Sequence, residues 1–171
     1  WQVDVYLPDD SRHLWVHVRI RNQNDHPIPY YWWTNIAVPQ TARTRVLARA
    51  CHTVNHTMDH RVVNADYPYA RGGDISYPTK LEDPASLFFL AESSERPWIA
   101  SVDADGRGIL QCSTHALCGR KYWAYGTRQG GKHWMDFLSL PGNGDYIEIQ
   151  AGITPTQTQT RPIAAQASLE W

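Results

Sequence analysis

One segment near the end of the sequence, DYIEIQAG at residues 145–152, has residue types that could do acid–base chemistry. Read as a β-strand, it places Tyr146, Glu148 and Gln150 on one face and Ile147 and Ile149 on the other. The isoleucines suit a core, so the opposite face would present a phenol, a carboxylate and an amide. This pattern fits a general base in a concave sheet, and it also fits a hydrogen-bonded or ion-paired glutamate on an open sheet face.

The aromatic residues of the chain are mostly amphipathic, since there are 8 Trp and 9 Tyr but only 3 Phe. Trp and Tyr combine an apolar face with a polar group, as sugar rings do, although Trp-rich cores have the same composition. Two aromatic segments, YYWWTN at 30–35 and KYWAYG at 121–126, supply candidate sugar-binding residues. The full set of binding candidates is Trp32, Thr34, Asn35, Trp123 and Tyr125, together with Gln150 and Tyr146.

Strand alternation divides the YYWWTN candidates into two sets. Trp32 and Thr34 would share one face, whereas Tyr31, Trp33 and Asn35 would share the other. Only one set can face a pocket, and the sequence leaves open which one it is.

A base at Glu148 would exchange sugar anomers only together with an acid that protonates the ring oxygen. Tyr31 and His56 are the candidates for this second catalytic group. His52, His56 and His60 are spaced four apart, which on a helix could bind a metal ion. The Thr, Val, Asn and Asp residues between them favour a loop instead, so we expect one histidine to reach a cleft and none to hold a metal.

The remaining metal and cofactor motifs are incomplete. Cys112 and Cys118 have only His115 between them, which is too few ligands for a zinc site. The acids at 103–106 lack the later ligands of a calcium loop, and the glycines at 126–131 lack the phosphate-binding spacing. We therefore expect no metal and no cofactor.

Composition restricts the class of protein. The 171 residues suffice for one domain with a core, and the formal net charge of -1 predicts neither a nucleic-acid nor a membrane partner. No apolar run approaches a membrane span, and the first residues do not form a signal peptide. Three cysteines without a framework spacing favour reduced thiols and a cytoplasmic location. Because the chain starts with Trp1 and not with Met, we expect it to be a fragment of a longer protein.

Most of the sequence has the alternation or the β-branched and aromatic composition of strands. An Asp105–Gly106 turn between two apolar segments predicts a hairpin over 96–114. No window of 11 residues shows a helical period, although 39–50 is helix-permissive. The sequence therefore predicts a single all-β domain over 1–171, an antiparallel β-sandwich. The other expected strands are 13–22, 28–38, 44–48, 86–92, 121–127, 134–140, 145–152 and 167–171, with short strands near 61–66 and 74–78 and a glycine-rich connector at 128–133.

Several blocks together resemble a bacterial family of domains of unknown function that usually precede tetratricopeptide repeats in large cytosolic proteins. The blocks are YYWWTNIAVP, DISYP, RPWIASVDADGRGILQ, HWMDFLSLPG and DYIEIQAGITPTQTQ. That family is similar, more distantly, to galactose mutarotases (aldose 1-epimerases). The resemblance implies a galactose-mutarotase-like supersandwich of antiparallel sheets, of which this chain would be the C-terminal part and an incomplete domain.

The mutarotase resemblance also implies roles for residues. The mutarotase strand LETQ carries the catalytic base, and IEIQ here would place Glu148 in that position with Gln150 beside it. The mutarotase acid, a histidine, corresponds to a position near Tyr31. The implied function is a carbohydrate-recognising domain, either an epimerase or glycoside-processing enzyme or a non-catalytic sugar-binding or protein-interaction module. An open sheet edge in an incomplete domain would also allow a homo-oligomer.

Overall fold

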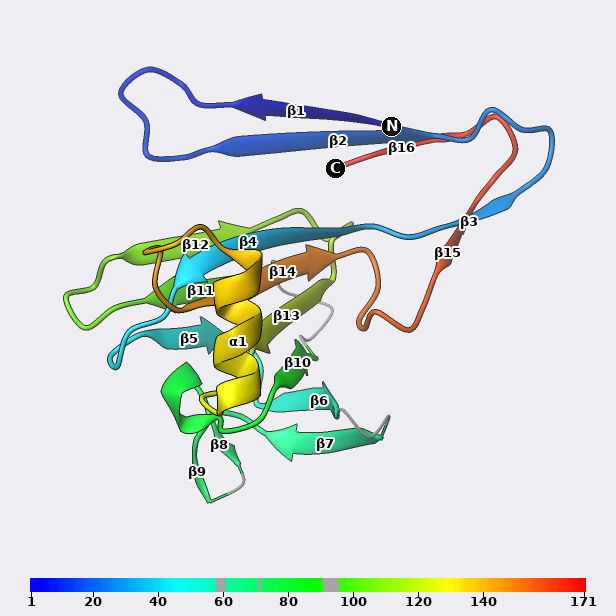
Figure 1. The fold of residues 1–171 in the computed structure, drawn as a ribbon. Coiled ribbons are helices and arrows are strands. Elements are labelled where there is room, and N and C mark those ends of the chain that lie inside the picture. The colour runs from blue at the N-terminus through cyan, green and yellow to red at the C-terminus, as the bar shows by residue number, and fades with distance from the viewer. Residues whose placement is uncertain (58–60, 71, 91–95) are drawn as a thin grey trace. The chain divides into compact units, whose positions relative to one another are not determined.

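The computed structural model describes residues 1–57, 61–70, 72–90 and 96–171. It is mostly β, with antiparallel strand pairs and one short α-helix in the described part (Figure 1). The chain divides into two compact units. One combines Trp1–Tyr31 with Thr158–Trp171, and the other contains Trp32–Gln157. No described helix has the length and hydrophobicity needed to cross a membrane.

The unit formed by the two ends of the chain is a pair of small antiparallel sheets. Its few buried residues are Val18, Asn22 and Ile163, and the Asn22 amide donates to the carbonyl oxygens of His26 and Ile163. β1 is an edge strand whose residues are all exposed, and the homo-oligomer expected through such an edge stays a prediction. The strands are β1 (Gln2–Tyr6), β2 (Trp15–Arg21) and β16 (Ser168–Glu170), and β3 (Ile28–Tyr30) with β15 (Arg161–Ile163).

The larger unit contains a six-stranded sheet and a three-stranded sheet. The six-stranded order is β4 (Trp33–Pro39), β14 (Tyr146–Gly152), β13 (Gly119–Ala124), β10 (Ala85–Phe89), β6 (His52–His56) and β7 (Val62–Asp66). The three-stranded order is β12 (Gly108–Cys112), β11 (Trp98–Val102) and β5 (Arg45–Ala48). The remaining elements are β8 (Tyr69–Ala70), β9 (Gly73–Asp74), the 3-10 turn η1 (Pro78–Lys80) and α1 (Gln129–Leu138).

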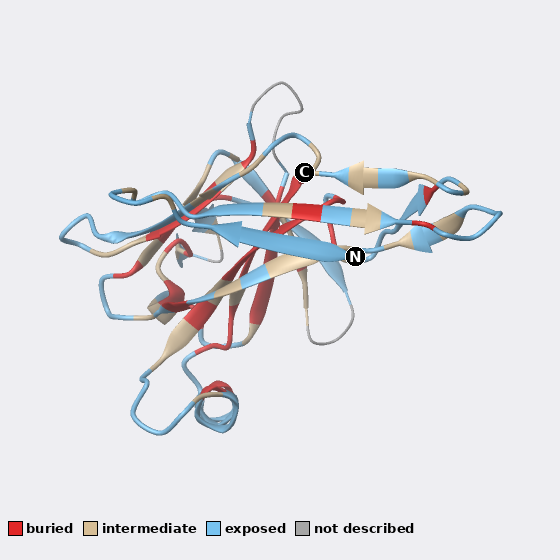
Figure 2. Ribbon diagram, turned by 90° about the horizontal axis from the view of Figure 1, so that it is seen from above, coloured by how far each residue is buried: buried red, intermediate tan, exposed pale blue. Residues whose placement is uncertain are grey.

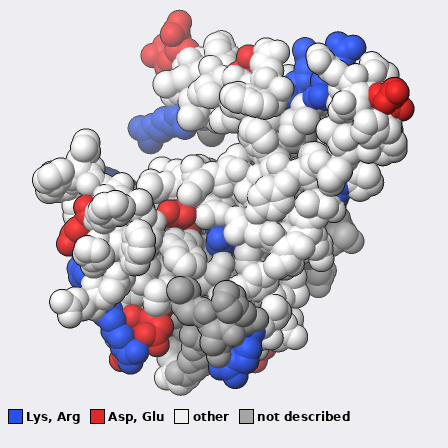
Figure 3. All heavy atoms as spheres, turned by 45° about the vertical axis from the view of Figure 1, so that its right-hand side comes forward, with Lys and Arg blue, Asp and Glu red and all other residues white. Residues whose placement is uncertain are grey.

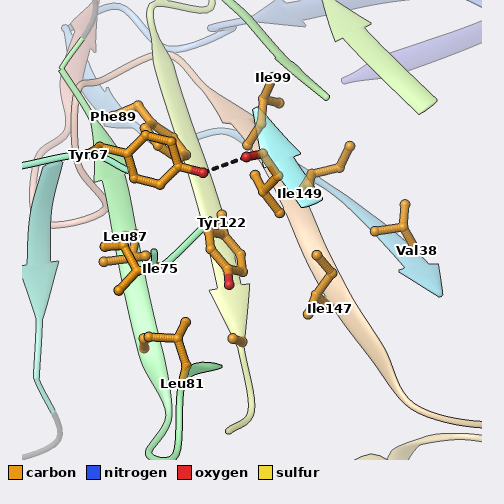
Figure 4. Packing of buried hydrophobic residues seen from close by; sticks show 13 residues of the cluster. Val38, Tyr67, Ile75, Leu81, Leu87, Phe89, Ile99, Tyr122, Ile147 and Ile149 are labelled. Atoms are coloured by element: carbon orange, nitrogen blue, oxygen red, sulfur yellow. Dashed lines mark hydrogen bonds between the residues drawn. The ribbon is translucent and has the colours of Figure 1, made fainter. Parts of the chain in front are cut away.

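The core of the larger unit combines one face of the six-stranded sheet with residues of β5 and β11. Ile147, Ile149 and Tyr122 are fully buried on neighbouring strands, and Ile99 of β11 belongs to the same cluster (Figure 4). Tyr67 satisfies its hydroxyl by donating to the Val46 carbonyl at 2.6 Å. Figure 2 shows that buried residues follow the strands of this unit. Because side chains alternate along a strand, the other sheet face is left for polar and aromatic residues.

Several expected elements are confirmed. The hairpin forms from β11 and β12, and Gly106 supplies the positive φ of 78° that its turn requires. The expected strand over 28–38 is instead two strands, β3 and β4, which pair in different sheets. Residues 31 and 32 between them are also where the two compact units meet along the chain.

The strand expected over 134–140 is wrong, because these residues and the glycine-rich connector before them form α1 and the turn that follows. Gly131 and Met135 are buried four residues apart on one helix face. Gly131 lies so close to the Tyr125 carbonyl oxygen that a Cβ would overlap it. The helix was hidden because its two glycines and three aromatic rings weaken a helical propensity that packing overrides.

The loop expected for the histidines is also wrong for the two histidines that the structure describes. His52 and His56 are the first and last residues of β6, which pairs with β7 on one side and β10 on the other. His60 lies outside the described residues. Between 39 and 50 the structure confirms the expected short strand, β5, rather than a helix.

Gly119 and Gly152 make room for the indole ring of Trp33 on the polar face of the sheet. Gly152 pairs with Trp33, and a Cβ at Gly152 would overlap that ring. We expect Gly152→Ala to destabilise the fold by about 1–3 kcal/mol, because the ring can move only by disturbing its packing on Phe88. The midpoint and slope of urea unfolding measure this change.

The matched control for Gly152→Ala is Gly130→Ala in α1, where nothing lies within 4 Å of the added Cβ. We expect that variant to gain about 0.5–1 kcal/mol from helix propensity. Equal effects of the two substitutions would show that the Trp33 contact does not limit the space at Gly152.

Candidate functional site

Glu148 lies in the middle of β14, and the expected alternation around it is confirmed. Ile147 and Ile149 are fully buried in the core, whereas Glu148 is half-buried on the opposite face. Cross-strand pairing places Trp123 of β13 on one side of Glu148 and Ala37 of β4 on the other. The carboxylate therefore stands on the polar face of the sheet, with an indole as its neighbour.

Three side chains donate hydrogen bonds to the Glu148 carboxylate. The Tyr125 hydroxyl donates to Oε1 at 2.8 Å, and Oε2 accepts from Asn35 Nδ2 at 2.8 Å and from Gln150 Nε2 at 3.0 Å. An ionised carboxylate only accepts and offers about four lone-pair positions. Three of these positions accept from Tyr125, Asn35 and Gln150, and a position on Oε1 remains for a further donor.

Two tyrosines extend this network. The Tyr146 hydroxyl donates to the Tyr125 oxygen at 3.0 Å, and their rings pack edge to face with centroids 5.1 Å apart. Burial, followed by the hydrogen bonds to Tyr146 and Glu148, raises the pKa of Tyr125. Tyr125 thus keeps its proton near neutral pH and can only serve Glu148 as a donor.

A second chain of hydrogen bonds connects Glu148 to a lysine that the sequence did not single out. Lys121 Nζ donates to Gln157 Oε1 at 2.6 Å, and Gln157 Nε2 donates to Gln150 Oε1 at 2.8 Å. Gln150 then donates to Glu148. Because an ammonium group only donates, Lys121 fixes the orientation of both amides and ensures that Glu148 receives an N–H.

Lys121 is buried between aromatic rings. Its Nζ lies 5.4 Å from the centre of the Phe88 ring and 5.5 Å from that of Trp123. Burial lowers the pKa of Lys121 to about 8, and the negative charge of Glu148 opposes part of this effect. A lysine in the middle of a strand, on the same face as Trp123, was the signal that could have found it.

The binding candidates of the YYWWTN segment do not all reach the site. Asn35 does, whereas Thr34 is on the other face, where its hydroxyl accepts from Gln111 Nε2 at 2.9 Å and from the Ala151 amide. Trp32 precedes β4, and its carbonyl accepts from the Ile153 amide. The indole on the Glu148 face is that of Trp33, which packs against Phe88.

The two candidates for the acid lie in different compact units. Tyr31 belongs to the unit formed by the two ends of the chain, whereas His56 and Glu148 belong to the larger unit. Burial raises the pKa of Tyr31, which makes it a weaker acid. His56 is on the same sheet face, but three strand spacings from Glu148, about 14 Å. That distance is too long for His56 and Glu148 to act on one sugar ring.

The described residues contain no cluster of three or more metal-ligating side chains. None of the three cysteines, all of which are described, forms a disulfide. The site on β14 and β13 consists of the Glu148 carboxylate, the Lys121 ammonium group, two hydrogen-bonded glutamine amides and aromatic rings. Such a set can bind hydroxyl groups and apolar ring faces.

Residues 1–169 match the family described as a domain of unknown function, DUF5107. The chain belongs to this family. The sequence prediction of a family of unknown function is thereby confirmed. The DUF5107 domain is also similar to the solved structure of a TPR-domain containing protein from Parabacteroides distasonis ATCC 8503. The TM-score is 0.81 at 20% identity, and the match covers 98% of this chain but 28% of that chain. At this identity the likeness shows the fold alone.

Proposed function

We propose that the sheet face around Glu148 binds a carbohydrate. The observation that carries this proposal is the arrangement of the carboxylate. Three donors hold it in place, one acceptor position on Oε1 stays available, and the indole of Trp123 stands directly across from it. A sugar hydroxyl can donate to Oε1 while an apolar face of the same sugar packs on the indole.

The surroundings of Glu148 suit a neutral, hydroxylated ligand. Lys121 uses one of its three donors on Gln157, which leaves donors for a ligand oxygen. Figure 3 shows that residues other than Lys, Arg, Asp and Glu make up most of the viewed surface. A ligand with many hydroxyl groups and little charge matches such a surface.

The mutarotase resemblance extends this proposal to the fold and to catalysis. We assign the domain to the galactose-mutarotase-like supersandwich type, with Glu148 in the position of the base. Anomer exchange also needs a proton donor on the same ring. Lys121 is diagonal to Glu148 on the neighbouring strand, and its pKa is lowered to about 8, so it is our candidate for this proton donor. Binding is the primary function that we propose, and exchange is its testable extension.

The proposal also includes the cellular setting. The similar protein from Parabacteroides distasonis is described as containing a TPR domain. By analogy, we propose that this domain is the carbohydrate-recognising part of a cytoplasmic tetratricopeptide-repeat protein.

Saturation-transfer NMR with a panel of monosaccharides and trisaccharides tests the binding proposal. We expect at least one sugar to bind at millimolar concentration and Glu148→Gln to weaken it about tenfold or more, because a charge-assisted hydrogen bond is lost and an amide group is turned toward two donors. Exchange spectroscopy of the same sugar reports anomer exchange, which Glu148→Gln would abolish if the carboxylate is the base.

The control for Glu148→Gln is Glu82→Gln, which removes an exposed carboxylate that pairs with Arg128. Thermal unfolding of both variants checks that they are folded, and Trp123→Ala provides a second variant of the site. If no sugar of the panel binds, or if Glu148→Gln binds as tightly as Glu82→Gln, the carbohydrate proposal is wrong.

A further inference from the structure

The row of side chains that contains Glu148 and Trp123 continues across the sheet. Trp123 pairs with Ser86 of β10, and Ser86 pairs with His56 of β6. Directly paired residues of an antiparallel sheet project to the same face. Glu148, Trp123, Ser86 and His56 therefore form one line perpendicular to the strands, which we call the cross-strand row.

The far end of the cross-strand row has polar atoms without an internal partner. Neither the Ser86 hydroxyl nor the His56 ring nitrogens make a side-chain hydrogen bond to another residue in the described ranges. His56 packs on the Phe88 ring with centroids 4.7 Å apart, which fixes the position of the imidazole. These atoms are therefore available to hydrogen-bond to water or to a ligand.

The chemistry of this end matches hydroxyl groups. Burial and the charge of Lys121 lower the pKa of His56, so the imidazole is neutral near pH 7. A neutral imidazole offers one donor and one acceptor, and a serine hydroxyl does the same. A sugar hydroxyl also donates and accepts, whereas an anionic group would need fixed donors only.

We propose that the cross-strand row binds a glycan chain of about three sugar residues, laid across β14, β13, β10 and β6. Glu148 holds one end, Trp123 packs against the middle, and Ser86 and His56 hold the other end. This inference rests on the proposed function and specifies its ligand as an oligosaccharide. The row spans about 14 Å, which is longer than a single sugar ring.

A chain-length series tests the oligosaccharide. NMR titration of the labelled protein would use β-1,4-linked glucose, mannose and galactose ladders of one to four residues. We expect affinity to rise about tenfold or more from one sugar residue to three and then to level off, because the fourth residue passes beyond His56. His56→Ala should weaken the trisaccharide about fivefold to tenfold, from the loss of neutral hydrogen bonds, and leave the monosaccharide unchanged.

His52→Ala is the matched control. His52 is on the same strand and the same face, but outside the cross-strand row and paired with Asp66. It should leave every affinity unchanged. Ser86→Ala is a smaller change at the same end of the cross-strand row, and it replaces His56→Ala as the test variant if His56→Ala disturbs the packing on Phe88.

The outcomes separate this inference from the proposed function. Affinity that does not depend on chain length, or a His56→Ala effect that is equal for one and three sugar residues, overturns the oligosaccharide inference alone. Sugar binding that still depends on Glu148 would then leave the proposed function standing. If no ladder member binds, both are wrong.

Discussion

Replacing Lys121 with methionine is expected to stabilise the fold at pH 7 and to weaken sugar binding at the same time. Lys121 is 7% exposed, and burial is the first cause of its lowered pKa. Because burial lowers the pKa of Lys121 from 10.5 to about 8, keeping the ammonium group charged in the fold costs about 3 kcal/mol at pH 7, and methionine avoids this cost. The same change removes the donor that orients Gln157 and Gln150, so we expect affinity to fall about tenfold.

The pH dependence of stability provides a separate readout for Lys121. Its pKa is about 8 in the folded state and near its ordinary 10.5 in the unfolded state. Between these values the unfolded chain binds more protons, so the free energy of unfolding rises with pH. The full effect corresponds to about 3 kcal/mol. Below pH 8 both states are protonated and this slope disappears.

Urea unfolding at pH 7, 8, 9 and 10 for the natural protein and Lys121→Met measures this contribution. Taking the difference between the two proteins cancels the other titrating groups, including the buried tyrosines. We expect the advantage of Lys121→Met at pH 7 to shrink as the pH approaches 10. The exposed Lys80 gives the control, since Lys80→Met should show neither effect. A Lys121→Met protein that is less stable at pH 7 would mean that the lysine is retained for folding.

The face that carries Glu148 could be predicted because strand alternation is a local property. Tyr146, Glu148 and Gln150 needed only the period of two within one segment. The choice between Thr34 and Asn35 could not be made in the same way. It depends on how β4 pairs with β14, and the two strands are separated by more than 100 residues of sequence. Register of this kind is set by packing between distant segments.

The chain of hydrogen bonds from Lys121 to Glu148 could not be predicted from the sequence for a related reason. Lys121 is recognisable as a charged residue on the Trp123 face of a strand. Gln157, however, lies in the loop after β14, and nothing in its sequence neighbourhood indicates a contact with Lys121. His56 was chosen as a catalytic partner because histidine suits acid–base work. The number of strands between His56 and Glu148 became apparent only from the sheet order.

Replacing Arg120 is expected to destabilise the fold, whereas replacing its neighbour Lys121 is expected to stabilise it. It is 1% exposed on the other face of β13, and it donates to the carbonyls of Leu117, Gly119 and Pro97 at 2.8 Å and to Ser113 Oγ at 2.6 Å. Burial lowers the pKa of Arg120 to about 10, so it stays charged near pH 7. We expect Arg120→Leu to cost about 3 kcal/mol or more, because several buried acceptors lose their donor together.

Urea unfolding of Arg120→Leu, compared with Arg107→Leu, checks this prediction. Arg107 is exposed in the β11–β12 turn, where it pairs with Asp105, and its loss should change stability by less than about 0.5 kcal/mol. The contrast with Lys121 follows from the acceptors left behind. Three of those around Arg120 are backbone carbonyls that cannot turn toward other donors, whereas Lys121 leaves one glutamine amide, which can rotate. If Arg120→Leu were as mild as Arg107→Leu, the guanidinium would not be what joins the start of β11 to β13.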